Sequence, residues 1–443
     1  MSTDWRKHYG SRFISPDMAA SMVTDGDFVA FTMGREAFAC GFALAARVGD
    51  LKGVDVLAFT PTYDFGWYDE AWRDSFHVII GMPTGTAQEA VDARRVDFFV
   101  TAPIEQLYLE RVPDVLFTEL SAPDENGFCS FGNSVWDKKK QIHRVRKQGR
   151  PVIAEINSKL IRTFGDNFIH VSEIDYFVEH VSSGISQAAG TLAGRAHREP
   201  EPYLKDIAGY VATLIEDGAT VQIGVGRTTE PLVQLGILAG KHDIGFHTEA
   251  TPPGVISLVK EGVVNGSRKT LYPGKVVATS IGGSTAEEMA WVHNNPLFML
   301  MDHEWLEDFR TIAANDNMTA VNNALLVDLA GQVTAETIGF RIRSSPGGQP
   351  MFVFGALQAN NGKSITVLPS VSVNGKSRIV PFMPEGSFVT IPRNFTDYVV
   401  TEYGIAKLRG KTLRHRNEEL IAIAHPDHRA MLRKEARRLY GKM

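Results

Sequence analysis

The feature that most constrains the fold is an internal repeat. Residues 25–35 and 217–227 both begin with Asp-Gly, carry Val at the fifth position and end with Gly-Arg, and they lie 192 residues apart. An amphipathic helix is expected directly before each copy. Helix, glycine turn, apolar strand and glycine-rich exit therefore occur twice in the same order. A repeat this long is not a solenoid period. We therefore expect two related α/β domains in tandem, although helix–turn–strand units also resemble one another by chance.

The second copy gives the clearest helix. Its apolar residues recur with a 3.6-residue period, and Gly218 is the expected C-cap. The residues on the expected buried face are Ile207, Val211, Leu214 and Ile215. A charged, Pro-punctuated segment at 198–202 predicts the boundary between the domains, which places an N-terminal domain at 1–200 and a C-terminal domain at 201–443.

Other elements can be placed by the same signals. We expect a buried strand at 152–156, a turn at 121–127 and strands at 364–368 and 388–391. Residues 413–440 predict helix with a break at Pro426.

Composition bounds the class of protein. The chain has 443 residues, of which 44% are hydrophobic, and its formal net charge is −5. This mild acidity offers no electrostatic footprint for nucleic acid or an anionic membrane. The two cysteines, Cys40 and Cys129, fit a reducing compartment and are expected to be buried apolar residues. No signal peptide or long apolar run is found, so we expect a cytoplasmic protein.

A single carboxylate, Glu249, stands at the end of a short apolar strand, before a Pro-Pro-Gly turn at 252–254. In open α/β sheets the crevice beyond the carboxyl ends of the strands is the ligand site. Glu249 is therefore a candidate nucleophile, and the alternative is an ordinary solvated or capping glutamate.

Gly224-Val-Gly226 follows an expected strand and suggests an anion held by backbone N–H groups. A dinucleotide-binding interpretation is disfavoured, because the third glycine of that motif is absent. The histidines near 303 and 425 lack the spacing of a metal site, and we expect no metal. No Gly-x-Ser-x-Gly nucleophile elbow occurs.

Several longer runs resemble the acetyl-CoA hydrolase/transferase branch of the family I CoA-transferases, whose members include 4-hydroxybutyrate CoA-transferases. Together they span nearly the whole chain. The matching runs are 164–172, 244–268, 321–333, 347–349, 362–363, 395–411 and 424–427. The resemblance implies two similar α/β halves with the active site between them and a homodimer or higher homo-oligomer. It also implies coenzyme A as a substrate, with no permanently bound cofactor.

The resemblance further implies a mechanism. Glu249 would attack an acyl-CoA thioester, giving a mixed anhydride and then a glutamyl-CoA thioester, and a small carboxylic acid would accept the CoA. The side-chain amide of Asn322 and the backbone N–H groups of Gly347 and Gly348 are the implied oxyanion donors, with turn and loop residues as the alternative. If water reached the anhydride, the protein would be an acyl-CoA hydrolase. A non-catalytic CoA-binding protein is the remaining alternative.

The remaining candidates concern the substrate. The resemblance assigns Gly224, Gly226, Gly362 and Lys363 to CoA or substrate binding. Arg227 and Arg343 stand where family members more often carry small or aromatic residues, and Pro350-Met-Phe352 replaces an acidic member of the motif. A guanidinium pairs well with a carboxylate, so either arginine is a candidate for a second carboxylate of the acid or an acidic group of CoA. The alternative is two solvent-facing or structurally paired arginines.

Overall fold

The computed structural model describes residues 7, 9–34, 36–100, 111–181, 200–282 and 284–441. The chain forms two compact units. The first contains Met1–Ala196 and Thr279–Trp305, and the second contains His197–Ala278 and Leu306–Met443. The segment 279–305 therefore belongs to the first unit although it interrupts the second in sequence. The division into domains at 1–200 and 201–443 stays a prediction.

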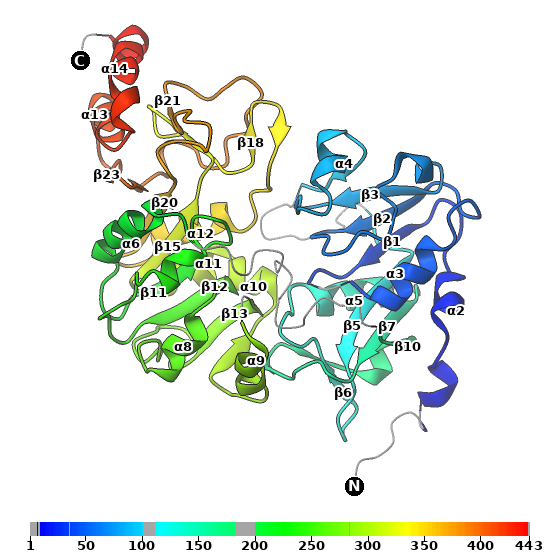
Figure 1. Ribbon diagram of the computed structural model, residues 1–443. Helices are drawn as coiled ribbons and strands as arrows, with labels where there is room; N and C mark the ends of the chain where they lie inside the picture. Colours follow the sequence, from blue (N-terminus) through cyan, green and yellow to red (C-terminus); the bar gives the residue numbers. More distant parts are fainter. Residues whose placement is uncertain are drawn as a thin grey trace. The chain divides into compact units, whose positions relative to one another are not determined.

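The first unit is built on a parallel sheet with strand order β10-β7-β5-β1-β2-β3-β4 (Figure 1). Its strands are β1 (Phe28–Phe31), β2 (Val54–Ala58), β3 (Phe76–Ile80), β4 (Asp97–Phe98), β5 (Val115–Ser121), β7 (Val152–Asn157) and β10 (Tyr176–Glu179). Its helices are α2 (Pro16–Ala20), α3 (Phe38–Ala45), α4 (Gln88–Asp92), α5 (Lys138–Lys147) and α9 (Ala286–Val292), with 3₁₀ turns at Gly10–Arg12, Glu70–Trp72 and Val171–Glu173. Two further pairs are β6 (Phe128–Ser130) with β9 (Phe168–His170) and β8 (Phe164–Gly165) with β14 (Phe298–Leu300).

The second unit repeats this plan with strand order β23-β22-β20-β15-β11-β12. These strands are β11 (Thr220–Ile223), β12 (Gly245–Thr251), β15 (Met318–Asn323), β20 (Lys363–Val367), β22 (Tyr398–Thr401) and β23 (Gly404–Lys407). The helices are α6 (Tyr203–Leu214), α7 (Pro231–Gln234), α8 (Val255–Lys260), α11 (Phe309–Ala313), α12 (Gln349–Gln358), α13 (Leu413–Ala422) and α14 (Pro426–Tyr440). Strand β13 (Val276–Ile281) and helix α10 (His303–Glu307) each contain residues of both units. Small sheets join β16 (Leu326–Asp328), β17 (Val333–Thr334) and β21 (Ile379–Val380), and β18 (Thr337–Ile338) with β19 (Arg341–Ile342).

The two sheets confirm the repeat found in the sequence. Strands β1 and β11 begin and end 192 residues apart. Each is flanked by parallel strands in the same relative order, β5 and β2 around β1 and β15 and β12 around β11. The expected fold class, two related open α/β domains, is therefore confirmed.

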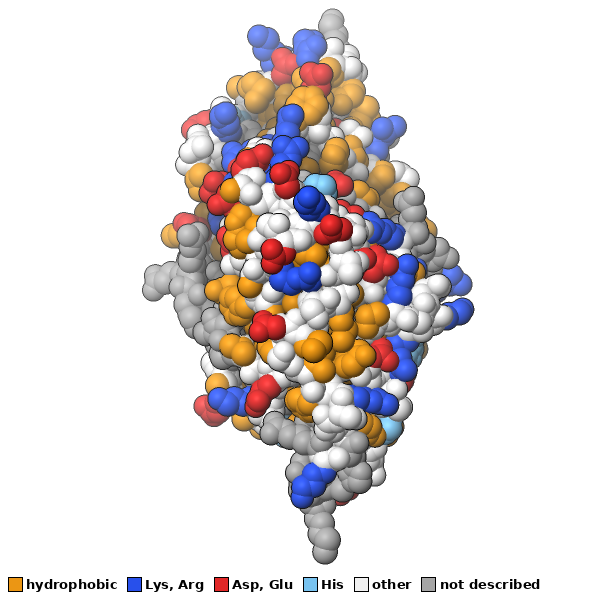
Figure 2. All heavy atoms as spheres, turned by 90° about the vertical axis from the view of Figure 1, so that its right-hand side faces the viewer, with side chains coloured by type: hydrophobic (Ala, Val, Ile, Leu, Met, Phe, Trp, Pro, Cys, Tyr) orange, Lys and Arg blue, Asp and Glu red, His pale blue; other side chains and the backbone are white. Residues whose placement is uncertain are grey.

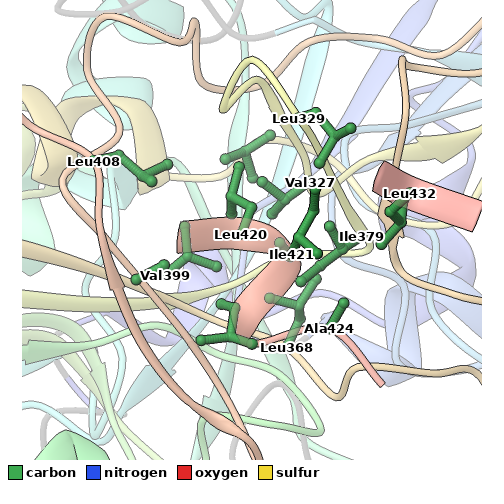
Figure 3. Packing of buried hydrophobic residues seen from close by; sticks show 14 of the residues in the cluster. Val327, Leu329, Leu368, Ile379, Val399, Leu408, Leu420, Ile421, Ala424 and Leu432 are labelled. Carbon is green, nitrogen blue, oxygen red and sulfur yellow. The ribbon is translucent and has the colours of Figure 1, made fainter. Parts of the chain in front are cut away.

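In the second unit, a cluster of buried apolar residues packs against the last two helices, α13 and α14. Figure 3 shows the labelled apolar side chains meeting around α13, from strands, loops and α14. The two helices are separated by a short break before Pro426, as the sequence predicts. The labelled members of this cluster are Val327, Leu329, Leu368, Ile379, Val399, Leu408, Leu420, Ile421, Ala424 and Leu432.

Two predictions are wrong: the end of the helix before β11 and the strand at 388–391. Helix α6 ends at Leu214 rather than continuing to Gly218, because Ile215 already has an extended backbone. Gly218 has a φ of +74° and makes the turn into β11 instead. Residues 388–391 form a loop with one isolated bridge at Ile391 rather than a strand. Phe388 donates its backbone N–H to the hydroxyl of Thr337, and Thr390 and Ile391 donate theirs to the carbonyl of Val333, but these bonds do not continue into a ladder of paired strands.

The expectations for two strands, one turn and the cysteines hold. Strands β7 and β20 and the turn between β5 and β6 lie where the sequence places them. Cys40 and Cys129 are both buried, and burial raises the pKa of the Cys129 thiol to about 12. Over the described part of the chain, no helix combines the length and apolar character needed to cross a membrane. Figure 2 shows acidic and basic side chains interspersed over one face, without a broad region of one sign.

Candidate active site

Glu249 lies near the carboxyl end of β12 and is half-buried. The strand ends two residues later, and a Pro-Pro-Gly turn leads into α8. Gly254 in that turn has a φ of +91°, a backbone conformation that suits glycine. The local structure therefore agrees with the strand-end position expected for Glu249.

Gly224 follows the neighbouring strand β11. The two strands pair at Thr220 with Gly245 and at Val221 with Phe246, and this register, continued past the last pair, sets Gly224 against Glu249. A hydrogen bond of 3.4 Å from the Thr248 hydroxyl to the Ile223 carbonyl keeps the chains together near this point.

The side chain of Asn322 lies over Gly224. An ideal Cβ on Gly224 would be only 2.4 Å from Asn322 Oδ1, so glycine is required for this approach. The Asn322 amide is 4% exposed and forms two hydrogen bonds, each 3.0 Å, with the buried amide of Gln222. The structure thus brings Gly224 and Asn322 together, and Gln222 is a member of this group that sequence reasoning missed.

The glycine loop at 347–348 leads directly into α12. Gly347 has a φ of +51°, and Gly348 is the N-cap of the helix. An ideal Cβ on Gly348 would lie 2.8 Å from the carboxyl carbon of Glu307, so this glycine lets the carboxyl group approach the loop. Gln349, the next residue, is buried, and its Nε2 has no hydrogen-bond partner among the residues described by the structure. Gln349 belongs to the matching run 347–349, but the sequence analysis gave it no role in the site.

His247 connects β12 to the segment that carries Glu307. Its Nε2 lies 2.8 Å from the carbonyl oxygen of Leu306, and since a carbonyl only accepts, Nε2 carries the proton. The ring also makes an edge contact with Phe352 on α12, with 6.3 Å between ring centroids. Burial, and after it the charge of Lys269, lowers the pKa of His247 to about 3, so the ring is neutral at physiological pH.

The two candidate arginines differ in exposure. Arg227 has an exposed side chain just beyond β11, next to Gly226. Arg343 is half-buried beyond β19, and its backbone N–H donates to the carbonyl of Glu336 at 2.7 Å. Gly226 packs against Asn323, since an ideal Cβ there would lie 2.6 Å from Asn323 Oδ1.

Gly362 and Lys363 lie away from this edge of the sheet. Lys363 opens β20 and pairs in register with Thr319, three residues before Asn322 on β15. Its ammonium group forms an ion pair with Glu216 and donates to the Leu214 carbonyl at 3.3 Å. An ideal Cβ on Gly362 would lie 1.9 Å from the carbonyl oxygen of Ala356. The chain turns so tightly here that only glycine fits.

Comparison with known proteins identifies the family. Residues 1–185 match the acetyl-CoA hydrolase/transferase N-terminal domain, and residues 284–436 match the C-terminal domain of the same family. A 4-hydroxybutyrate coenzyme A transferase of Clostridium kluyveri is 36% identical over 99% of this chain and 100% of the relative. A succinyl-CoA:cyclohexane-1-carboxylate CoA transferase of Geobacter metallireducens is 34% identical over 98% of this chain and 97% of the relative.

Solved structures agree. The 4-hydroxybutyrate CoA-transferase of Porphyromonas gingivalis superposes with a TM-score of 0.78 at 31% identity, covering 99% of this chain and 100% of that chain. RipA from Yersinia pestis gives a TM-score of 0.86 at 28% identity with the same coverage. The relatives' names confirm the predicted enzyme class, an acyl-CoA:carboxylate CoA-transferase. The chain belongs to the acetyl-CoA hydrolase/transferase family.

Proposed function

We propose that this enzyme moves CoA between an acyl-CoA thioester and a small carboxylic acid through covalent intermediates on Glu249. The observation that carries the proposal is the grouping at the carboxyl edge of the second sheet. The register of β11 and β12, continued past their last paired residues, sets Glu249 against Gly224, and the amide of Asn322 lies over that glycine. A carboxylate beside a polar amide at a strand end is the arrangement that nucleophilic acyl transfer needs.

The chemistry requires no general base, because a glutamate is ionised near neutral pH. A carboxylate oxygen of Glu249 attacks the thioester carbonyl, the C–S bond breaks, and CoA leaves as the thiolate. The thiolate then attacks the glutamyl carbonyl of the mixed anhydride and releases the acyl group as its carboxylate. The acceptor acid reverses both steps on the glutamyl-CoA thioester, which restores the Glu249 carboxylate.

Each tetrahedral intermediate carries an oxyanion that needs fixed donors. Asn322 Nδ2 carries two protons, and one of them is used in the bond to Gln222. The other is the proposed side-chain donor, and the backbone N–H groups of Gly347 and Gly348 are the proposed backbone donors. The amide pair with Gln222 supports this assignment, because it holds the Asn322 amide in one orientation before substrate binds.

Coenzyme A is a substrate in this scheme, and the scheme needs no other cofactor. Arg227, Arg343 and the Gly224–Gly226 exit are proposed to bind CoA or the acid. The roles of Gly362 and Lys363 in binding stay predictions, and a homodimer or higher homo-oligomer is also proposed.

The test is an assay of acyl-CoA consumption with and without an acceptor acid. The wild type should turn over acyl-CoA only when a carboxylic acid is present, and Glu249→Gln should lose that activity while keeping its thermal stability. Glu261→Gln, at the exposed end of α8, is the matched control and should keep wild-type rates. Turnover of comparable rate without an acceptor would identify a hydrolase instead. No turnover by the wild type with any acid would overturn the proposal.

A further inference from the structure

Lys269 is a buried lysine in the loop between α8 and β13. It is 4% exposed, and its Nζ has no hydrogen-bond partner among the described residues. Lysine is almost never fully buried unless its charge is paired, because moving an ammonium group out of water is costly. A buried lysine without a partner therefore needs a functional or structural explanation.

The aliphatic stem of Lys269 packs against the first residue of β12. An ideal Cβ on Gly245 would lie 2.3 Å from Lys269 Cγ and 2.7 Å from its Cδ. The same point lies 3.4 Å from the hydroxyl of Thr220 on β11, which is also buried without a hydrogen-bond partner in the described part of the chain. The lysine stem thus occupies the space that any side chain at position 245 would fill.

That packing puts the lysine on the face of β12 that carries Glu249. Successive side chains of a strand point to opposite faces, so positions 245, 247 and 249 share one face. His247 is the member of this row whose pKa is lowered by the charge of Lys269, after the larger effect of its own burial. The ammonium group is therefore within electrostatic reach of the imidazole.

His247 also contacts the segments that form and flank the glycine loop. Its Nε2–H donates to the carbonyl of Leu306, and the next residue, Glu307, has its carboxyl group against Gly348. The ring also contacts Phe352 one turn into α12. A change in the position of His247 would move strand β12 on one side and the loop that precedes α12 on the other.

We propose that Lys269 is a positioning residue controlled by its own proton. When its amine is neutral, His247 keeps its contact with Leu306. When the amine is protonated, an uncompensated charge beside the ring displaces that contact, and the nucleophile strand and the glycine loop lose their alignment. Burial lowers the pKa of Lys269 to about 7, so the change falls near neutral pH.

Among the residues that the structure describes, the ammonium group of Lys269 forms no ion pair and no hydrogen bond. The neighbouring strands present His247 from β12 and the hydroxyl of Thr220 from β11. Its own loop presents Arg268, an exposed cation that packs over Gly218. Glu307 is the carboxylate on the far side of the His247–Leu306 contact. The titration of Lys269 itself is governed by burial.

The inference rests on the proposed function only where turnover is measured. The first variant is Lys269→Met, which keeps the apolar stem and removes the charge. Arg268→Met removes a charge from the adjacent residue and is the matched control. In the wild type and the control, kcat should fall about tenfold between pH 8 and pH 6 with a midpoint near 7. In Lys269→Met, kcat at pH 6 should remain near its value at pH 8, with an unchanged KM for acyl-CoA. The same fall in Lys269→Met as in the wild type would overturn the proposal.

A second measurement uses wild-type protein alone and does not depend on turnover. In wild-type protein labelled with ¹³C at lysine Cε, one resonance should titrate near pH 7, whereas ordinary lysines titrate near ~10.4. The imidazole resonances of His247 should shift over the same range of pH. Absence of such a lysine resonance, or a His247 signal that does not follow it, would overturn the proposal. If the resonance titrates as expected but no acid supports turnover, the proposed function fails and the assignment of Lys269 as the titrating group stands.

Discussion

The side-chain amides of Asn322 on β15 and Gln222 on β11 form two hydrogen bonds with each other, each 3.0 Å long. Both residues are buried, and the Asn322 amide lies over Gly224, which the continued register of β11 and β12 sets against Glu249. The orientation of the proposed oxyanion donor thus depends on a partner 100 residues earlier in the chain.

Replacing Gln222 by Leu should lower kcat by roughly 10–100-fold, because an oxyanion donor that loses its orientation loses part of the effect of ~10²–10³ that such a donor contributes. KM for acyl-CoA should change little. The variant should also lose about 1–3 kcal/mol in the free energy of unfolding, since the buried Asn322 amide is left without its partner. Urea unfolding and steady-state kinetics check both effects. If the variant loses stability but keeps the wild-type kcat, the Asn322 amide is not an oxyanion donor.

Gly348→Ala should reduce activity through the glycine loop. The new methyl group would lie 2.8 Å from the carboxyl carbon of Glu307, so the loop or the carboxyl group must move. Gly209→Ala in α6 is the control, because no atom lies within 4 Å of the added methyl group. The control should keep full activity and gain about 0.5–1 kcal/mol of stability. Equal activity in the two variants would show that the loop tolerates the shift and would argue against backbone donors at this position.

Arg227→Met and Arg343→Met test the substrate assignment. If either guanidinium binds a second carboxylate of the acid, kcat/KM should fall for a dicarboxylate acceptor and stay unchanged for a short monocarboxylate. A uniform loss with every acid would point to CoA binding. Unchanged rates and ratios in both variants would leave the arginines as solvent-facing or structural residues.

His247 should make folding more stable as the pH rises through the acid range. Its pKa is about 3 in the folded protein and 6.5 in an unfolded chain, so the unfolded state binds the extra proton between these values. This contribution is complete above about 6.5 and is lost as the pH falls toward 3. The free energy of unfolding of the wild type, relative to His247→Gln, should therefore increase from pH 3 to 6.5. A difference that does not vary with pH over this range would contradict a buried neutral imidazole.

The sequence predicted the parts of the fold that local signals control. The repeat at 25–35 and 217–227 placed β1 and β11, and the Pro-Pro-Gly turn placed Glu249 at the end of its strand. The loop at 388–391 was predicted to be a strand because its apolar residues suit a strand, whereas in the structure it pairs only through an isolated bridge at Ile391. Local patterns do not distinguish these two cases.

The contacts that complete the candidate site depend on strand order, which local patterns do not give. Gln222 meets Asn322 only because β11 and β15 are neighbours in the sheet. The stem of Lys269 occupies space that Gly245 leaves open, and nothing in the neighbouring residues of the sequence separates this lysine from a solvated one. The resemblance assigns Lys363 to CoA or substrate binding, and that role stays a prediction; in the structure Lys363 is the first residue of β20 and pairs with Glu216.

The most direct test of the central claim is to trap the covalent intermediate. Wild-type enzyme incubated with acyl-CoA without an acceptor acid, and then treated with borohydride, should be modified at a single residue, which peptide mass spectrometry should identify as Glu249. Glu249→Ala should carry no modification and no transferase activity. Modification of a different carboxylate, or near-normal turnover by Glu249→Ala, would contradict the account.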